Sequence, residues 1–269
     1  MNVVFALSDH PFETALLTGW LQERPLDRLG IALLPRLARG PGEPTRLTWA
    51  LLQWCLRKLV GVDRPWPRPG NFARTRNLDV ARFAGLADTG LQSFVKARHT
   101  DLLISWNRPR HPVALTELPH LGAINVHPGA HPEVLGESPW VWELDSGKGR
   151  LSTVLHRPLD EDRLGPQLAE AWHEAEPGTT PFLHQYQAMQ VAARLLPVVG
   201  EELDKGEVAE YEPAATAVVQ HGSPDSALRR RLRDRGHPIR SWKERFKLLA
   251  GAHDGFVAHH ERLHAAKPN

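Results

Sequence analysis

Short apolar runs, each followed by a segment of helical or turn character, constrain the fold of this chain more than any other feature. The clearest runs cover residues 3–7, 30–34, 101–105 and 121–124. Runs of this length, rich in valine, leucine and isoleucine, are typical of strands that are buried on both faces. Because they alternate with helical segments over about the first 180 residues, they predict an α/β fold with a Rossmann-like, mostly parallel sheet flanked by helices.

Helical spacing of apolar residues predicts the segments that cover this sheet. Helices are expected over residues 11–23, 48–60, 88–96, 113–118, 182–203, 227–235 and 243–249. Gly206 lies just beyond the longest of them, where a glycine commonly ends a helix. Residues 63–70 contain three prolines and are expected to form a surface loop. We therefore predict an α/β domain over residues 1–180 and a C-terminal helical extension over residues 181–269.

Composition places the chain among ordinary globular proteins. It has 269 residues and a formal net charge of +2 at pH 7, which argues against nucleic acid as a partner. Cys55 is the single cysteine, so an internal disulfide is excluded and a reducing compartment is favoured. The sequence starts without a basic leader, and no apolar run approaches the roughly 20 residues that cross a bilayer. We expect a cytoplasmic protein without membrane association.

A carboxamide and an imidazole stand two residues apart at the end of one predicted strand. Asn125 and His127 follow the apolar run 121–124. Residues i and i+2 of a strand face the same side, so the two side chains can converge at its C-terminal end. That end is where open α/β sheets bind their ligands. An amide donor beside a titratable imidazole suits acyl transfer to an amine. A dinucleotide site receives little support, because no glycine-rich loop follows the first strand.

The segment from residue 101 to about residue 168 resembles the formyltransferase domain, found in methionyl-tRNA, glycinamide ribonucleotide and sugar-nucleotide formyltransferases. The residues that carry the resemblance are the apolar strand 101–105, Asn125-Val126-His127-Pro128, Pro132, Gly136, Pro139, Trp142, the strand 153–156 that ends in His156, and Gly165-Pro166. Several spaced elements agree, so the signal is more specific than a single tripeptide. Before residue 90 the similarity is only general.

The resemblance implies a role for each residue of the pair. Asn125 would donate a hydrogen bond to the oxygen of the formyl group as it becomes an oxyanion. His127 would move or stabilise protons, since the reference pKa of histidine lies near ~6.5. The alternative is that Asn125 satisfies a turn and His127 caps a strand. His131 stands where the family usually has leucine, and it either lines the pocket or faces water.

The third catalytic residue of the family is the main departure. An aspartate is expected two residues before Gly165, where this chain has Arg163. Asp162 is the nearest acid, and a one-residue bulge would bring it into place to orient the imidazole and tune its pKa. Otherwise the position is lost, and the segment that includes Asp160 and Glu161 is a solvated acidic turn.

The resemblance also implies the ligands. It names 10-formyltetrahydrofolate as formyl donor and a small-molecule amine as acceptor, with Ser105, Trp106, Asp160 and Glu161 beside the folate and Gly136 and Ser138 beside the acceptor. No metal site is expected, since His259, His260 and His264 lack accompanying acids or cysteines. The C-terminal helices either pack on the sheet or pair two protomers in a homodimer.

Three functions remain open from the sequence. The first is a folate-dependent N-formyltransferase with Asn125, His127 and Asp162 as catalytic residues. The second is a non-catalytic relative that binds a ligand or serves as a partner subunit, an interpretation that Arg163 favours. The third is a tRNA contact through the basic segment 229–233, whose alternative is a solvated helix face.

Overall fold

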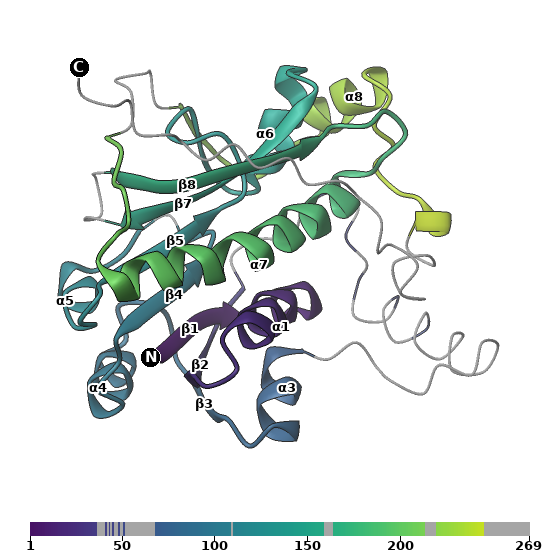
Figure 1. Ribbon diagram of the computed structural model, residues 1–269. Helices are drawn as coiled ribbons and strands as arrows, with labels where there is room; N and C mark the ends of the chain where they lie inside the picture. The colour runs from purple at the N-terminus through teal and green to yellow at the C-terminus, as the bar shows by residue number, and fades with distance from the viewer. Residues whose placement is uncertain are drawn as a thin grey trace, which may run out of the picture.

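A seven-stranded sheet forms the centre of the computed structural model, which describes residues 1–36, 41, 43, 45, 48, 51, 68–108, 110–158, 164–212 and 219–244 (Figure 1). The strands lie in the order β3-β2-β1-β4-β5-β7-β8, and the first five of these are mutually parallel. β7 and β8 join antiparallel at one edge. The strands are β1 (Asn2–Ser8), β2 (Arg28–Leu34), β3 (Asp79–Arg82), β4 (Leu102–Trp106), β5 (Ala123–His127), β7 (Arg150–Pro158) and β8 (Leu164–Glu174). The predicted α/β, mostly parallel sheet is confirmed.

Side chains of β1 alternate between two apolar layers, which explains why its sequence is continuously apolar. Val3, Phe5 and Leu7 belong to the layer that contains helices α1 (Thr14–Glu23) and α7 (Pro181–Lys205). Val4 and Ala6 belong to the opposite layer, which is closed by helix α4 (Thr89–Ala97) and its residues Leu91 and Val95. A strand covered on both faces has no polar side to present, so the period of two is hidden in the sequence.

Several elements complete the fold, and some of them were not predicted. They are the 3-10 helix η1 (Pro11–Glu13), α3 (Pro69–Thr75), α5 (Val113–Thr116), β6 (Val134–Gly136), α6 (Pro139–Ser146), β9 (Val219–His221) and α8 (Ser226–Asp234). The loop predicted over residues 63–70 is wrong for residues 69 and 70, which begin α3. Proline is tolerated in the first turn of a helix, where its missing N–H has no partner to lose. The same reason applies to α6, which begins at Pro139.

Two predicted helices fall largely outside the described residues. Only residues 48 and 51 of the segment 48–60, and only residues 243 and 244 of the segment 243–249, are described. The predicted helices over residues 182–203 and 227–235 are confirmed as α7 and α8. Gly206 ends α7 with a positive φ of 70°, as expected.

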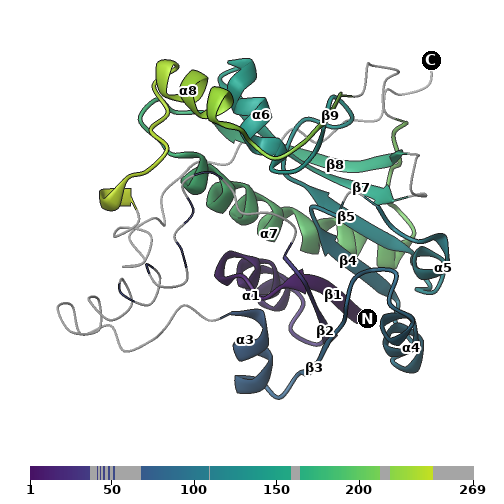
Figure 2. The same ribbon diagram turned by 180° about the vertical axis from the view of Figure 1, so that it is seen from behind.

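The C-terminal helices pack on different parts of the molecule. α7 lies along the sheet and shares the largest apolar cluster with β1, α1 and β8 (Figure 1). α8 packs instead on α6, because its buried Leu228 and Leu232 join Trp140, Val141 and Leu144 in a separate cluster. Figure 2 shows α6 and α8 side by side near the edge formed by β7 and β8.

The connection of the strands creates a switch point between β1 and β4. The chain leaves β1 toward β2 and β3 on one side, then returns to β4 and continues toward β5 on the other. In open α/β sheets the crevice at such a reversal, beyond the carboxyl ends of the strands, is the usual ligand site. The strand ends that border this crevice are Ser8 of β1 and Trp106 of β4.

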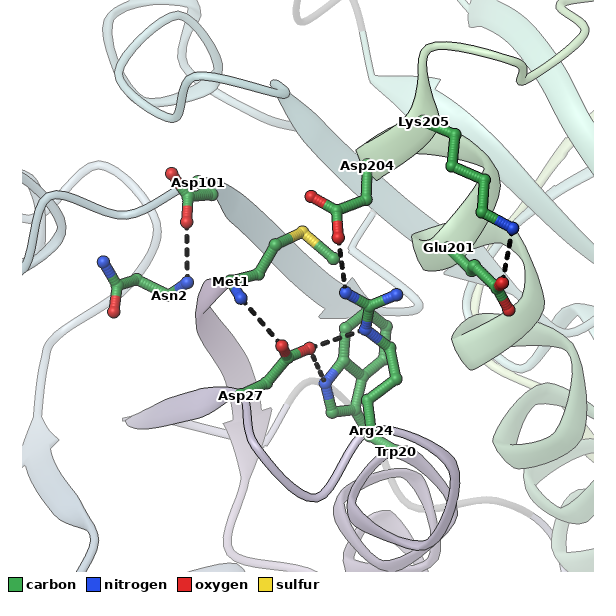
Figure 3. A network of polar contacts seen from close by, with 9 residues as sticks. All are labelled: Met1, Asn2, Trp20, Arg24, Asp27, Asp101, Glu201, Asp204 and Lys205. Carbon is green, nitrogen blue, oxygen red and sulfur yellow. Dashed lines mark hydrogen bonds and ion pairs between the residues drawn. The ribbon is translucent and has the colours of Figure 1, made fainter.

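A network of ion pairs fixes the opposite end of β1 (Figure 3). Asp27 accepts from the Met1 amine at 2.7 Å, from Arg24 Nε at 2.7 Å and from Trp20 Nε1 at 3.1 Å. Arg24 also donates through Nη2 to Asp204 at 2.7 Å, near the end of α7. This network joins the start of β1, the end of α1 and the end of α7.

Among the described helices, none combines the length and the apolar character that a bilayer crossing requires.

Candidate active site

Asn125 and His127 end β5, and both side chains point to the same face of the sheet. Asn125 is in register with Ser105 of β4 on one side and His156 of β7 on the other. Ile124 and Val126 point to the opposite face, into the cluster that contains α7. The geometry predicted for the pair from the period of two is therefore present.

Three hydrogen bonds hold the Asn125 amide in one orientation. Its Oδ1 accepts from Ser105 Oγ at 3.0 Å and from the Arg108 backbone N–H at 3.1 Å. Its Nδ2 donates to His156 Nε2 at 2.9 Å, and His156 in turn donates from Nδ1 to the Arg157 carbonyl at 3.0 Å. A carboxamide has two N–H hydrogens. One is used by His156, so the other is the donor that Asn125 can offer to a ligand oxygen.

His111 holds the Ser105 hydroxyl that binds Asn125. Its Nε2 lies 2.7 Å from Ser105 Oγ. The single hydroxyl hydrogen of Ser105 is directed to Asn125 Oδ1, so the hydroxyl oxygen must accept, and His111 carries its proton on Nε2. His111 is 1% exposed. Sequence reasoning missed it, and its one signal is a histidine that follows the strand 101–105 by a few residues in a turn.

His127 is neutral and keeps one ring nitrogen free for a proton. Its Nε2 donates to the Val134 carbonyl at 2.7 Å, which leaves Nδ1 as the acceptor. Burial and, to a smaller extent, the charge that His156 would carry if protonated lower the pKa of His127 to about 3, although the hydrogen bond to the Val134 carbonyl acts in the opposite direction. Among the described residues, the structure shows no carboxylate in contact with this ring.

His131 packs into the space between these imidazoles, so the interpretation that it faces water is wrong. Its ring stacks on His156 with centroids 4.2 Å apart and lies 5.7 Å from the ring of His127. Gln167 donates to His131 Nδ1 at 3.3 Å and to its backbone carbonyl at 2.6 Å. Burial lowers the pKa of His131 to about 2, with His156 and His127 as further causes.

The described part of the site is closed around the pair. Asn125 is 2% exposed and His127 is 4% exposed. A cavity of about 40 Å³ lies at the β1–β4 switch point, and neither Asn125 nor His127 is among its lining residues. It is lined by Ser8, Glu13, Arg36, Trp106, Asn107, Arg108, Glu137, Ser138, Trp140 and Gln185. Arg108 connects the two places, since its backbone N–H donates to Asn125 and the residue also lines the cavity.

The other predicted site residues divide between these two places. Ser105 contacts Asn125, whereas Trp106 and Ser138 line the cavity. Gly136 ends β6 and pairs with His221 of β9, and a Cβ there would lie 2.0 Å from the His221 carbonyl oxygen. Its φ of +107° also favours glycine. A glycine is therefore required at position 136 by the backbone conformation and by the close approach of β9. Its contact with an acceptor stays a prediction.

Asp160, Glu161 and Asp162 lie outside the described residues, as does Arg163. The bulge that would place Asp162 beside the imidazole therefore stays a prediction. The same applies to His259, His260 and His264. Within the described ranges, no group of three or more histidine, cysteine, aspartate or glutamate side chains is arranged to hold a metal ion.

The basic segment 229–233 forms most of α8, and part of its charge is compensated. Arg231 pairs with Asp145 at 2.9 Å, and Arg235 lies 3.5 Å from the same carboxylate. A helix that directs charges into intramolecular pairs has fewer of them for phosphate groups.

Comparison with known proteins finds the relationship in three dimensions rather than in sequence. No protein-family model matches the chain, and no curated protein matches it. A sugar N-formyltransferase from a Shewanella species aligns over 82% of this chain and 77% of its own, with a TM-score of 0.55 and 14% identity. Glycinamide ribonucleotide transformylase 1 from Symbiobacterium toebii aligns over 79% and 95%, with a TM-score of 0.56 and 16% identity.

A third structure carries ligands. The N-formyltransferase from Helicobacter canadensis, in complex with folinic acid and dTDP-3-aminofucose, covers 82% of this chain and 71% of its own length. Its TM-score is 0.53 at 10% identity. The chain therefore has the fold of the formyltransferases, and the resemblance seen in the sequence motif is confirmed at the level of the fold.

Proposed function

We propose that the protein transfers a formyl group from 10-formyltetrahydrofolate to the amine of a small molecule. The observation that carries this proposal is the Asn125 amide, whose oxygen is occupied by two donors and whose nitrogen keeps one hydrogen for a ligand. An amide fixed in this way does not need to reorganise when charge develops on a carbonyl oxygen, and such preorganisation is the main source of oxyanion stabilisation.

The residues divide the work as follows. The amine nitrogen attacks the formyl carbon of the folate. The bond from that carbon to N10 then breaks, and tetrahydrofolate leaves with a proton on N10. Asn125 donates to the formyl oxygen, and Ser105, His111 and His156 keep its amide oriented. His127 accepts the proton of the attacking amine through Nδ1, since its Nε2 is bound to the Val134 carbonyl. Asp162 would raise the basicity of this imidazole, which burial alone depresses. Trp106, which lines the cavity, offers an apolar wall to the pterin.

The test is formyl transfer by the purified full chain. 10-Formyltetrahydrofolate is incubated with a panel of sugar-nucleotide, amino-acid and other small amines, and each product is examined for the mass gain of one formyl group. Release of tetrahydrofolate is measured in parallel. Asn125→Ala should lower turnover about 100 to 1000-fold. Lys96→Ala, a change at an exposed position of α4, should leave it unchanged.

A second function is favoured by the packing around the pair. Asn125 and His127 are buried, and the ring of His131 fills the space beside them. A protein that binds a ligand in the adjacent cavity without formyl transfer would have this closed arrangement. Ligand binding without turnover by any amine in the panel would favour this alternative over the enzyme.

A further inference from the structure

A groove lies on the surface formed by α8 and the residues that follow it, and we call it the α8 groove. It has a volume of about 780 Å³, and its described lining residues include three arginines and no acid. It shares no lining residue with the cavity at the β1–β4 switch point. A volume of this size is typical of binding sites, so the groove is large enough to hold a ligand of its own.

The arginines of α8 divide between two sides of the helix. Arg231 pairs with Asp145 at 2.9 Å, and Arg235 lies 3.5 Å from the same carboxylate. Arg229 and Arg233 are four residues apart, so they share another side of the helix, and both line the α8 groove. One side of α8 is therefore compensated within the molecule, whereas the other side keeps its positive charge.

The positive charge of the groove has no counterion in the described part of the chain. Arg240 lines the groove from the segment that follows α8. Neither this residue nor Arg229 or Arg233 forms an ion pair with a described carboxylate. Arg229 donates through Nη2 to the neutral Pro224 carbonyl at 3.3 Å. Like charges four residues apart on a helix repel each other, so an anionic partner beside Arg229 and Arg233 would be stabilising.

The remaining lining residues of the groove are apolar or lack a side chain. Pro238 and Ile239 are half-buried, and Ile239 packs against the cluster shared by α6 and α8. Gly178 lines the same surface, and a Cβ built there would meet no heavy atom within 4 Å. The groove therefore combines guanidinium groups with an apolar, uncovered surface.

The backbone donors beside the groove are already occupied, which disfavours phosphate as the anion. Phosphate sites commonly use free N–H groups at a helix N-terminus or in a turn. The N-terminus of α8 is capped by Asp225, whose Oδ1 accepts from the Leu228 N–H at 2.7 Å. The Gly178 N–H donates to the Gly236 carbonyl at 2.8 Å, and the Gly236 N–H donates to the Arg233 carbonyl at 2.9 Å. Carboxylates, which arginine binds through its planar fork, suit the remaining donors.

We infer that the α8 groove binds a segment of a partner protein in which acidic residues flank apolar ones. The carboxylates lie against Arg229, Arg233 and Arg240, and the apolar side chains lie against Pro238 and Ile239. The three arginines are exposed, so a peptide chain can enter and leave the groove. The inference does not depend on formyl transfer, because the binding is measured without folate or amine.

The experiment measures the binding of blocked hexapeptides to the full chain by calorimetry at physiological salt. The probe has two glutamates flanking two leucines, with a glycine at each end. In one control peptide glutamines replace the glutamates, and in the other glycines replace the leucines. The probe should bind at least about tenfold more tightly than either control, which corresponds to about 1.4 kcal/mol. Equal binding of the three peptides, or binding of none, would overturn the inference.

Single variants locate the binding surface. Arg233→Gln should weaken the probe at least about fivefold, as expected for the loss of a charge-assisted hydrogen bond. Arg230→Gln is the matched control, because Arg230 is exposed on the same helix and does not line the groove. Equal losses in the two variants would show a diffuse charge effect and contradict the inference.

Charge reversal gives an independent check. In the double variant with Arg229→Glu and Arg233→Glu, the probe should bind more weakly than it binds the wild type. A peptide with lysines in place of the glutamates should bind the double variant more tightly than the wild type, and no gain would count against the inference. An RNA homopolymer tests nucleic acid as the occupant. If it displaces the probe, and Arg230→Gln weakens it as much as Arg233→Gln, α8 is a nucleic-acid surface and the inference fails.

Discussion

Replacement of His131 by phenylalanine should make the protein more resistant to acid. The ring of His131 is stacked on His156, and its Nε2 has no partner among the described residues. Phenylalanine preserves the ring and the stacking but cannot take up a proton. The variant therefore isolates the cost of keeping one imidazole neutral inside the fold.

The magnitude follows from the difference in pKa between the two states. Burial lowers the pKa of His131 from 6.5 to about 2 in the folded protein, so between these values only the unfolded chain binds the proton. The free energy of unfolding therefore has its full value, as far as His131 is concerned, above pH 6.5. It decreases as the pH falls below 6.5, because the unfolded chain gains a proton that the folded protein does not bind. Each pH unit is worth about 1.36 kcal/mol, so the loss from pH 7 to pH 5 is about 2 kcal/mol.

The assay is guanidinium denaturation at pH 7 and at pH 5. The free energy of unfolding of the wild type should fall between the two pH values by about 2 kcal/mol more than that of His131→Phe. His120→Phe is the matched control, because His120 is exposed, and it should keep the wild-type pH dependence. If His131→Phe and the wild type lose the same free energy, His131 takes up a proton in the folded state and the packing argument is refuted.

Four further predictions test other parts of the structure. Asn125→Ala should lower kcat for formyl transfer by about 100 to 1000-fold, measured with the best acceptor, and an effect below tenfold would exclude it as the oxyanion donor. Asp27→Asn should lower the free energy of unfolding by about 3 kcal/mol, because it leaves the partly buried Arg24 poorly paired. Glu201→Gln, which breaks an exposed pair with Lys205, should change it by less than about 1 kcal/mol. Gly136→Ala should lower the free energy of unfolding by at least about 2 kcal/mol, since the φ of Gly136 is +107° and the new Cβ would clash with the His221 carbonyl. Amide hydrogen exchange in β9 should become faster in this variant, and an unchanged exchange rate would contradict the clash.

The fold was predictable where local pattern and burial agree. The central strands are apolar runs of five to seven residues, and their order of appearance with helices between them is enough to indicate a parallel sheet. α7 was predictable because apolar residues recur at helical spacing over many turns and Gly206 ends it. α3 was missed because it begins at Pro69, within the proline-rich segment that predicts a loop, and α6, which begins at Pro139, was not predicted.

The candidate site was predictable only in part, for a physical reason. The positions of Asn125 and His127 follow from the period of two within one strand. Ser105 and His111 reach Asn125 through pairing between β4 and β5 and through a turn, and contacts between separate strands leave no local pattern. Arg108 and Gln185 meet at the cavity although 77 residues of chain separate them. No local sequence pattern around Arg108 or Gln185 predicts that the two residues line the same cavity.

The length of α7 has a practical consequence for work on this protein. A helix of 25 residues is about 38 Å long, so one rod carries Gln185 at the cavity and Asp204 near its other end. Asp204 is held by Arg24, which shares Asp27 with the amine of Met1. A purification tag joined ahead of Met1 converts that amine to an uncharged amide. The ion pair between Met1 and Asp27 is then lost, and the network that links Asp27 and Arg24 to Asp204 of α7 is weakened. Binding and turnover are therefore best compared on protein whose tag has been placed elsewhere or removed without leaving extra residues.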